Sequence, residues 1–232
     1  MRKPLRIFGF ILSFLAGLYL LPAGAGLPSP DPAAFDYSIL RKGKEIGRHQ
    51  VRFVETPEGV RVDIKAKIKI KVAFITVFRL THNASEFWRD GQLIKLDATT
   101  HRNSKKADVE VTAQLRHLEI RTANGIDTAP LDSIPTSFTK TNLWQNGQDQ
   151  ELVLIDTLSG LQRPSDFRVG NWVKLDLGGH TIDARYYSIT RKDTGALTHE
   201  FWVDEAGNMM QTHLMTKDGQ SIFYRFSGAQ AS

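Results

Sequence analysis

The chain contains no cysteine among its 232 residues. Disulfide bonds, thiol catalysis and thiolate metal sites are therefore excluded, and so is a lipid anchor attached to a lipobox cysteine. An exported protein without disulfides is more typical of a bacterial periplasm or exterior than of a eukaryotic secreted domain. The fold must be stabilised by its hydrophobic core without covalent cross-links.

Catalytic and metal-binding motifs are also missing. The seven histidines form no His-x-His pair, and His199-Glu200 is not followed by a second histidine at the spacing of a zinc-protease helix. There is no Gly-x-Ser-x-Gly nucleophile elbow, and Gly178-Gly179 is an isolated turn rather than a phosphate-binding loop. We therefore expect no catalytic residue, no metal site and no cofactor, and the sequence favours a non-enzymatic protein.

The mature chain would carry little net charge. The formal net charge is +5, but Arg2, Lys3 and Arg6 lie in a segment that we expect to be removed, which leaves +2. Domains that bind nucleic acid usually carry a larger excess of basic residues. We therefore do not expect nucleic acid as a partner.

Residues 1–25 have the pattern of a secretory signal peptide. Met1–Arg6 carries three positive charges, Ile7–Leu21 is uncharged and mostly apolar, and Ala23–Ala25 (AGA) is a small-x-small cleavage site. The apolar run is too short for a comfortable transmembrane helix. We expect no stable membrane span after cleavage and a location in the periplasm or outside a Gram-negative bacterium. Retention of the segment as an uncleaved anchor is the alternative.

The rest of the chain divides into a linker, one domain and a short tail. Residues 26–34 (GLPSPDPAA) contain three prolines and are expected to form an extended linker. Residues 35–228 show turn signals at about 8–12-residue spacing and almost no helical periodicity, which is typical of a single all-β domain. Residues 229–232 form the tail. The expected strands are Phe35–Leu40, Ile46–Val54, Val60–Phe78, Ala84–Arg89, Leu93–His101, Asp108–Ala113, Leu118–Thr122, Glu151–Thr157, Phe167–Val169, Trp172–Leu177, Thr181–Thr190, Leu197–Val203, Met209–Thr216 and Ser221–Phe226.

The most regular stretch runs from Val60 to Phe78 (VRVDIKAKIKIKVAFITVF). Apolar residues occupy alternate positions as far as Phe74, and mostly charged residues lie between them. A period of two places the two sets on opposite faces of a β-strand. We expect one long strand that bends around a core as part of a strongly curved antiparallel meander sheet, an open or half-closed barrel. Its exposed face would carry Lys65, Lys67, Lys69 and Lys71.

The alternation of lysines stops at Ala73, after which Ala73, Ile75 and Val77 occupy the former lysine positions. Both faces are apolar there, so we expect both to be covered, by a second layer or by the walls of a hydrophobic pocket. The lysine face itself has two interpretations. It is either a solvated face whose like charges discourage edge pairing or a site for an anionic surface such as lipid headgroups.

The strand rhythm is interrupted between Gly125 and Gly147. Prolines and small polar residues predict a long loop, with a short helix near Phe138–Trp144. The apolar residues Ile134, Phe138, Leu143 and Trp144 favour a packed lid over a disordered segment.

A short motif occurs twice. Glu86–Asp90 (EFWRD) is repeated as Glu200–Asp204 (EFWVD). Lateral pairing of the two strands would bring Glu86 next to Glu200, and like charges at close range would raise one pKa, as general-acid catalysis requires. The alternative, which we prefer, is that each glutamate lies at the start of a strand and pairs with a lysine or arginine on a neighbouring strand.

Three segments carry a family resemblance. They are FDYSILRKGKEIG (Phe35–Gly47), EFWRDGQL (Glu86–Leu93) and NLW…LVLIDTLSG (Asn142–Gly160). With them the chain resembles a family of uncharacterised, exported β-rich proteins of Gram-negative bacteria, a domain of unknown function. The resemblance implies no catalytic residues. It implies an architecture similar to the curved sheets of periplasmic lipoprotein carriers, which hold acyl chains on a concave apolar face.

These observations favour a non-enzymatic binder or carrier of a hydrophobic or amphiphilic ligand. The anionic head of the ligand would lie near the lysine face formed by Lys65, Lys67, Lys69 and Lys71. A first alternative is an envelope scaffold that uses the lysine face to bind a protein, and a second is a hydrolase-like enzyme with a histidine–carboxylate centre. The residues expected to line the apolar ligand site are Phe74, Ile75, Val77, Phe78, Trp88, Phe138, Trp144 and Trp202.

Overall fold

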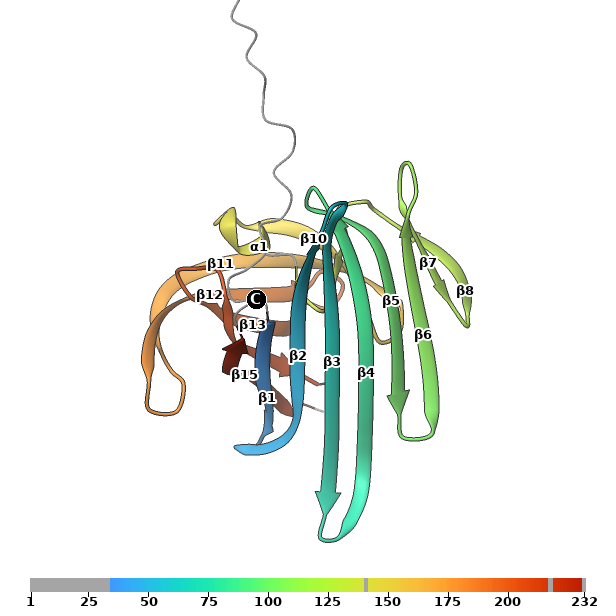
Figure 1. Cartoon of the computed structure of the whole chain (residues 1–232). Helices are drawn as coiled ribbons and strands as arrows, with labels where there is room; N and C mark the ends of the chain where they lie inside the picture. The colour runs from blue at the N-terminus through green and yellow to red at the C-terminus, as the bar shows by residue number, and fades with distance from the viewer. Residues whose placement is uncertain (1–33, 140–141, 217–218, 231–232) are drawn as a thin grey trace, which may run out of the picture.

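The computed structural model describes residues 34–139, 142–216 and 219–230. The signal peptide predicted at residues 1–25 and all but the last residue of the predicted linker lie outside this part of the chain. Within it, fifteen strands form one continuous sheet (Figure 1). The all-β prediction is confirmed.

The described strands and the short helix follow one another with brief turns. Their order along the chain is β1 (Ala34–Arg41), β2 (Lys44–Thr56), β3 (Gly59–Val72), β4 (Ile75–Arg89), β5 (Gln92–Arg102), β6 (Lys105–Ala113), β7 (Leu118–Thr122), β8 (Gly125–Ala129), β9 (Ile134–Pro135), α1 (Asn142–Gln145), β10 (Gln150–Ile155), β11 (Gln162–Asp176), β12 (Thr181–Arg191), β13 (Leu197–Val203), β14 (Met209–Met215) and β15 (Ser221–Gln230).

The sheet is an antiparallel meander whose first and last strands meet. The order across it is β8-β7-β6-β5-β4-β3-β2-β1-β15-β14-β13-β12-β11-β10-β9. The pairing of β1 with β15 joins two runs of sequential hairpins, and only β9 with β10 is parallel. Short turns between sequential strands suffice for this topology.

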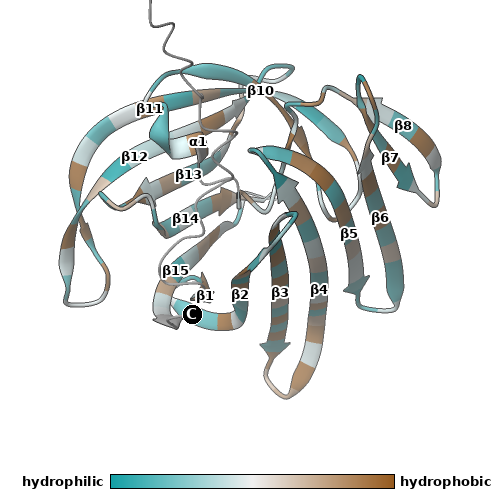
Figure 2. Ribbon diagram, turned by 45° about the horizontal axis from the view of Figure 1, so that its top comes forward, coloured by the Kyte–Doolittle hydropathy of each residue, from teal (hydrophilic) through white to brown (hydrophobic). Residues whose placement is uncertain are grey.

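The alternation of apolar and polar residues decides which face of each strand is buried. Val60, Val62 and Ile64 in β3 point to the inner face and are 7%, 1% and 2% exposed. Lys65 and Lys67 point to the outer face and are exposed. Figure 2 shows the result as alternating hydrophobic and hydrophilic bands along β3 and β4.

Two hydrophobic clusters fill the inner side of the sheet. The larger one lies against β1 to β8 and contains Trp88, Leu96 and Leu118. The second lies against β10 to β13 and contains Phe167 and Phe201, which pack against the loop around α1. A third, smaller cluster in the C-terminal half consists of Leu175, Ala184 and Met210.

Curvature brings the two ends of the sheet into side-chain contact. Gln162, at the start of β11, donates from Nε2 to Asp127 Oδ2 (2.9 Å) and to the Thr128 carbonyl oxygen (2.8 Å) in β8. Ile155, at the end of β10, is completely buried in the cluster under β1 to β8. Edge strands β8 and β9 are not neighbours in the sheet. The sheet is therefore strongly curved but not closed, which confirms the predicted half-closed barrel.

The prediction of one long strand from Val60 to Phe78 was wrong. The chain turns at Ala73 and Phe74. The stretch therefore consists of β3, a turn and the first residues of β4, and the two strands pair with each other. Ala73 has a φ of 51°, a left-handed conformation typical of a tight turn. The loss of polar alternation at Ala73 marks this turn and not a doubly covered strand.

The segment predicted as a long loop contains more structure than expected. β8, β9 and α1 all lie between Gly125 and Gly147. Phe138, Leu143 and Trp144 are buried in the second cluster, at 7%, 3% and 6% exposure. The segment packs over the core as the predicted lid. In β11, a bulge between Val169 and Trp172 joins two predicted strands into one.

Candidate functional site

The β3–β4 hairpin projects beyond the turns on either side of it (Figure 1). Its register pairs Ile68 with Leu80 and Ile70 with Phe78, and Val72 with Ile75 next to the turn. Since cross-strand partners share a face, the apolar residues of both strands continue the inner face outward from the core. The hairpin is therefore amphipathic along its whole length.

The inner face of this hairpin passes from buried to fully exposed. Ala66 is 7% exposed and Ile70 is half-buried, whereas Val72 is 62% exposed. The residues at the end, Phe74, Ile75 and Val77, are 99%, 71% and 50% exposed. The covering expected beyond Ala73 is thus absent among the described residues. We call Val72–Val77 the apolar tip.

The outer face of the same hairpin is basic. Lys65, Lys67, Lys69 and Lys71 are all exposed, in the positions that the sequence predicts. Within the described part of the chain, no carboxylate forms an ion pair with any of the four. Arg79, opposite Lys69 on β4, adds a further positive charge to this face. The lysine charges are therefore available to an external anion.

The other four predicted ligand residues do not join the apolar tip. Trp88 is buried in the larger cluster, and Phe138 and Trp144 belong to the second cluster. Trp202 lies on the outer face of β13 against the third cluster. Only Phe138 and Trp144 come together, through their shared contact with Phe201, whose ring centroid is 4.8 Å and 5.0 Å away from theirs. Below the lid, the space is occupied by side chains in contact.

Glu86 is a buried carboxyl whose hydrogen-bond partners were not predicted from the sequence. Its side chain is completely buried and accepts a hydrogen bond from the indole nitrogen of Trp88 (2.9 Å) and from the hydroxyls of Ser137 and Thr139. Burial raises the pKa of Glu86, although these hydrogen bonds act in the opposite direction. The carboxyl ties the lid to β4.

The pairing of Glu86 with Glu200, which the sequence left open but did not favour, does not occur. Their strands, β4 and β13, are not neighbours in the sheet. Glu200 instead lies on the outer face, where its Oε1 accepts from the Tyr186 hydroxyl (2.7 Å) and its Oε2 lies 2.5 Å from His213 Nδ1. The preferred alternative, a lysine or arginine partner for each glutamate, was also wrong. Among the described residues Glu86 accepts from an indole and two hydroxyls, and Glu200 is held by Tyr186 and His213.

The Glu200–His213 pair is partly shielded from solvent. The two side chains are 21% and 13% exposed, and the His213 ring stacks on Phe223 with centroids 4.5 Å apart. Nε2 of His213 is buried and has no hydrogen-bond partner among the described residues. Burial, followed by the hydrogen bond to Glu200, raises the pKa of Tyr186 to about 12.

Two buried histidines, His49 and His82, lie near the end of the core from which the hairpin projects. His49 is 8% exposed, and its ring lies between those of Tyr37 and Tyr224, at 5.7 Å and 5.4 Å. Burial lowers the pKa of His49 to about 4, and also lowers that of His82, whose Nδ1 lies 2.9 Å from Thr100 Oγ1. Across the described residues, no group of three histidine or carboxylate side chains is arranged to hold a metal ion.

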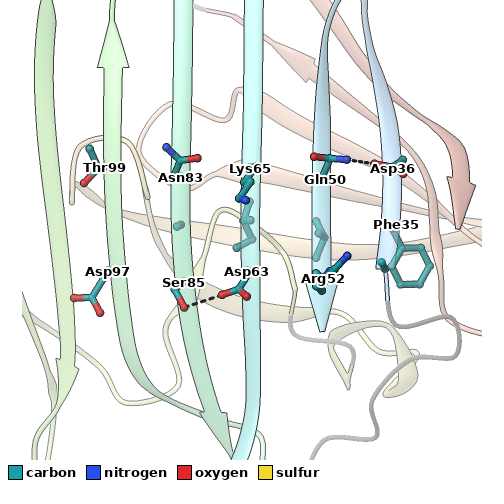
Figure 3. Close-up of a pocket in the computed structure, with 14 residues that line it drawn as sticks. Phe35, Asp36, Gln50, Arg52, Asp63, Lys65, Asn83, Ser85, Asp97 and Thr99 are labelled. Carbon is teal, nitrogen blue, oxygen red and sulfur yellow. Dashed lines mark hydrogen bonds between the residues drawn. The ribbon is translucent and has the colours of Figure 1, made fainter. Parts of the chain in front are cut away.

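A polar groove of about 540 Å³ runs across the outer face of β1 to β5 (Figure 3). Several of its polar groups are already paired with one another: Gln50 donates to Asp36 (2.7 Å) and Ser85 to Asp63 (3.1 Å). Lys65 belongs both to the groove and to the lysine face. The groove is thus the continuation of the basic hairpin face toward the body of the sheet.

Comparison with known families and structures now identifies the family of the chain. Residues 37–227 match the family described as Domain of unknown function (DUF6134). The chain belongs to the DUF6134 family. This agrees with the resemblance to an uncharacterised β-rich family. No curated protein matches the chain.

Solved structures of two other uncharacterised families are similar to this DUF6134 chain. A beta-barrel-like DUF1849 protein from Brucella abortus has a TM-score of 0.64 at 10% identity, covering 86% of this chain and 97% of that one. A DUF1089 family protein from Pseudomonas aeruginosa has a TM-score of 0.42 at 12% identity, covering 91% and 98%. The first likeness supports the barrel-like fold and carries no function. In the described part of the DUF6134 chain, no helix has the length and apolar character needed to span a membrane.

Proposed function

We propose that this chain is an exported, non-enzymatic protein that binds a hydrophobic or amphiphilic ligand at the β3–β4 hairpin. The supporting observation is the exposure of the apolar tip, where Phe74 is 99% exposed, directly beside an unpaired lysine face. The signal-peptide pattern of residues 1–25 supports a location in the periplasm or outside the cell.

The two faces of the hairpin match the two parts of an amphiphile. Ile70 and Phe78 offer an apolar surface that continues into the tip, and Lys69 and Lys71 lie on the opposite face of the same strand. Covering a large apolar side chain contributes about 1.5–3 kcal/mol, and the lysines attract an anionic head. Hydrocarbon would therefore lie on the inner face and tip, with the head toward the lysines.

Exposed apolar residues at the end of a hairpin are unfavourable in water unless they are used. Soluble proteins rarely expose contiguous apolar patches without an interaction role. Four consecutive or near-consecutive large apolar residues are at least half exposed here: Val72, Phe74, Ile75 and Val77. This exposure supports binding at the tip over a purely solvated lysine face.

Titration with a fluorescent long-chain fatty acid below its critical micelle concentration tests this function. The double variant Phe74→Ser/Ile75→Ser should bind about tenfold more weakly or worse, because two apolar contacts are lost. Leu115→Ser is the matched control, since Leu115 is 91% exposed in the turn at the far end of β6. Equal affinity of wild type and the double variant would refute the assignment of the site, and no binding by wild type would refute the function.

A second candidate, a hydrolase-like enzyme with a histidine–carboxylate centre, is favoured by one observation. Glu200 fixes Nδ1 of His213 and leaves Nε2 without a partner, which is the arrangement of a general base held by a carboxylate. A panel of chromogenic esters and glycosides tests it. Turnover that is lost in His213→Gln but retained in Tyr186→Phe would support this candidate, and the absence of turnover across the panel would remove it.

A further inference from the structure

We infer that the end of the sheet bearing the β3–β4 hairpin docks onto an anionic lipid bilayer, with the apolar tip inserted among the headgroups. This inference rests on the proposed function and names its partner. We define the basic end as residues 38–48, 67–81 and 101–106, which comprise the turns β1–β2, β3–β4 and β5–β6 with the strand segments that lead into them.

The three turns lie at the same end of the sheet (Figure 1). This follows from the antiparallel meander, in which every second turn returns to one end. Hydrogen bonds join neighbouring parts of this end: Arg79 donates its backbone N–H to Asn103 Oδ1 (2.9 Å), and Asn103 donates its own to the Arg79 carbonyl oxygen (2.8 Å). The β5–β6 turn is therefore fixed beside the hairpin and shares any surface that the hairpin contacts.

The charge of this end is almost entirely positive. Its one acidic residue, Glu45, already lies 3.3 Å from Arg48 and accepts from the Ser38 hydroxyl. An anionic surface would meet a continuous field of one sign, which increases the rate and strength of association at low salt. The basic residues are Arg41, Lys42, Lys44, Arg48, Lys67, Lys69, Lys71, Arg79, Arg102, Lys105 and Lys106.

The shape of the apolar tip fits a fluid surface better than a protein partner. Phe74 is 99% exposed, and Val72 and Ile75 on the two strands beside it are 62% and 71% exposed. Stable protein interfaces bury about 1,200–2,000 Å² between complementary surfaces, whereas a single hairpin end offers a narrow projection. A bilayer headgroup region closes around such a projection on all sides.

The spacing of tip and lysines matches the depth of an interfacial contact. Phe74 lies three residues beyond Lys71, in the turn that follows Val72, so it projects beyond Lys71 by less than the roughly 10 Å that three extended residues would span. Peripheral membrane segments typically bury their apolar face about 5–10 Å into the boundary between headgroups and acyl chains. The tip would reach this boundary while Lys71, Lys69 and Arg79 remain at the level of the phosphates.

Co-sedimentation with vesicles tests the inference on the full chain, produced with its own N-terminus and used in the form that the producing cell yields. Wild type should bind vesicles of phosphatidylcholine with about a third phosphatidylglycerol and should bind pure phosphatidylcholine about tenfold more weakly. Raising the ionic strength from about 0.05 M to 0.5 M should also weaken binding strongly. Two variants, Phe74→Ser/Ile75→Ser and Lys69→Glu/Lys71→Glu, should each lose tenfold or more.

The control removes one exposed apolar side chain and reverses one positive charge at the opposite end of the sheet. Leu115→Ser/Arg116→Glu changes an exposed leucine and an exposed arginine in the β6–β7 turn and should bind vesicles like wild type. Because every variant carries the same N-terminal segment, a contribution from that segment cancels in the comparison. Circular dichroism of each variant should confirm an unchanged sheet.

The outcomes separate this inference from the proposed function. Binding of the monomeric fatty acid without binding of anionic vesicles would overturn membrane docking and leave the proposed function intact. Equal vesicle binding by wild type and both hairpin variants would also overturn it. Retention of wild-type chain on an acidic protein in place of vesicles would assign the basic end to a protein partner and overturn the inference as well.

Discussion

Ile70 lies directly opposite Phe78 on the inner face of the β3–β4 hairpin. This pair marks the boundary between the part of the hairpin that belongs to the core and the part that leaves it. On its core side, Leu80 is 7% exposed, and on its far side Val72 is 62% exposed. The alternation of apolar residues along β3 therefore serves two purposes, burial in the first half and presentation to a partner in the second, and the pairing with β4 shifts register directly after Ile70.

This boundary predicts that alanine substitutions on the inner face of β3 lower the free energy of unfolding by unequal amounts. Ile64→Ala should lower the free energy of unfolding by about 2–5 kcal/mol, since Ile64 is 2% exposed in the main cluster. Ile70→Ala should cost about 1 kcal/mol or less because Ile70 is only half-buried. Urea denaturation of both variants gives the comparison, and equal losses would show that the hairpin is buried as deeply as the core.

Removal of the Glu86 carboxylate should change how stability depends on pH. Burial raises the pKa of Glu86 above its usual 4.5, so the folded state holds the proton more tightly than the unfolded state. Stability from this group is therefore greatest below pH 4.5 and falls as the pH rises through the raised pKa. Glu86→Gln should remove that decline, whereas Glu86→Ala should cost about 1–3 kcal/mol by leaving three donors without their acceptor.

Urea denaturation of wild type and Glu86→Gln from about pH 4 to pH 8 provides the measurement. Thr139→Val is a useful companion, because it removes one donor and leaves the carboxyl in place. A difference curve between wild type and Glu86→Gln that does not vary with pH would show that Glu86 titrates normally in the folded protein.

His49 should act in the opposite direction. Burial lowers its pKa from 6.5 to about 4, so its contribution to stability is present above pH 6.5 and is lost as the pH falls toward 4. Between about pH 7.5 and pH 5 the expected loss is roughly 2 kcal/mol. His49→Phe should abolish this loss, since a phenyl ring can keep the contacts with Tyr37 and Tyr224.

The matched comparison for His49 is the exposed His101→Phe, on β5. Chemical denaturation at the two pH values is sufficient. If wild type and His49→Phe lose the same stability on acidification, the acid sensitivity belongs to other groups, such as His82 and His199, whose pKa values burial also lowers.

Gly47 should be required for the close pairing of β2 with β3. A Cβ atom at Gly47 would lie 2.0 Å from the backbone oxygen of Lys67, which cannot move without breaking the ladder. Gly47→Ala should therefore cost about 1–3 kcal/mol of folding free energy. Gly228→Ala, where a Cβ meets nothing within 4 Å, is the control, and a similar small effect of both substitutions would contradict the tight approach.

Much of the fold was predictable because β-strands carry a period of two. The alternation in Val60–Val72 assigned its inner and outer faces correctly, including the exposed Lys65 and Lys71. The same alternation did not reveal the turn at Ala73, because Ala73 and Phe74 are not typical turn residues. Only the paired register of β3 with β4 shows that the chain reverses there.

The repeated motif shows why the site was harder to predict than the fold. In β4, Glu86 and Trp88 point inward and are fully buried, whereas in β13 Phe201 points inward and Glu200 faces outward. The alternation along a strand shows which residues share a face. It does not show which of the two faces packs against the core when both faces carry apolar residues. The partners of Glu86, Ser137 and Thr139, lie more than fifty residues away in sequence, and no local signal connects them.

The most direct test of the account is a fluorescence measurement at position 74. Because the chain has no cysteine, Phe74→Cys can be labelled at a single site with an environment-sensitive dye, and Leu115→Cys provides the same label at the opposite end. Addition of vesicles containing phosphatidylglycerol should shift the emission of the dye at position 74 to the blue and leave that at position 115 unchanged. No shift at position 74, or equal shifts at both positions, would contradict the claim that the hairpin tip contacts lipid.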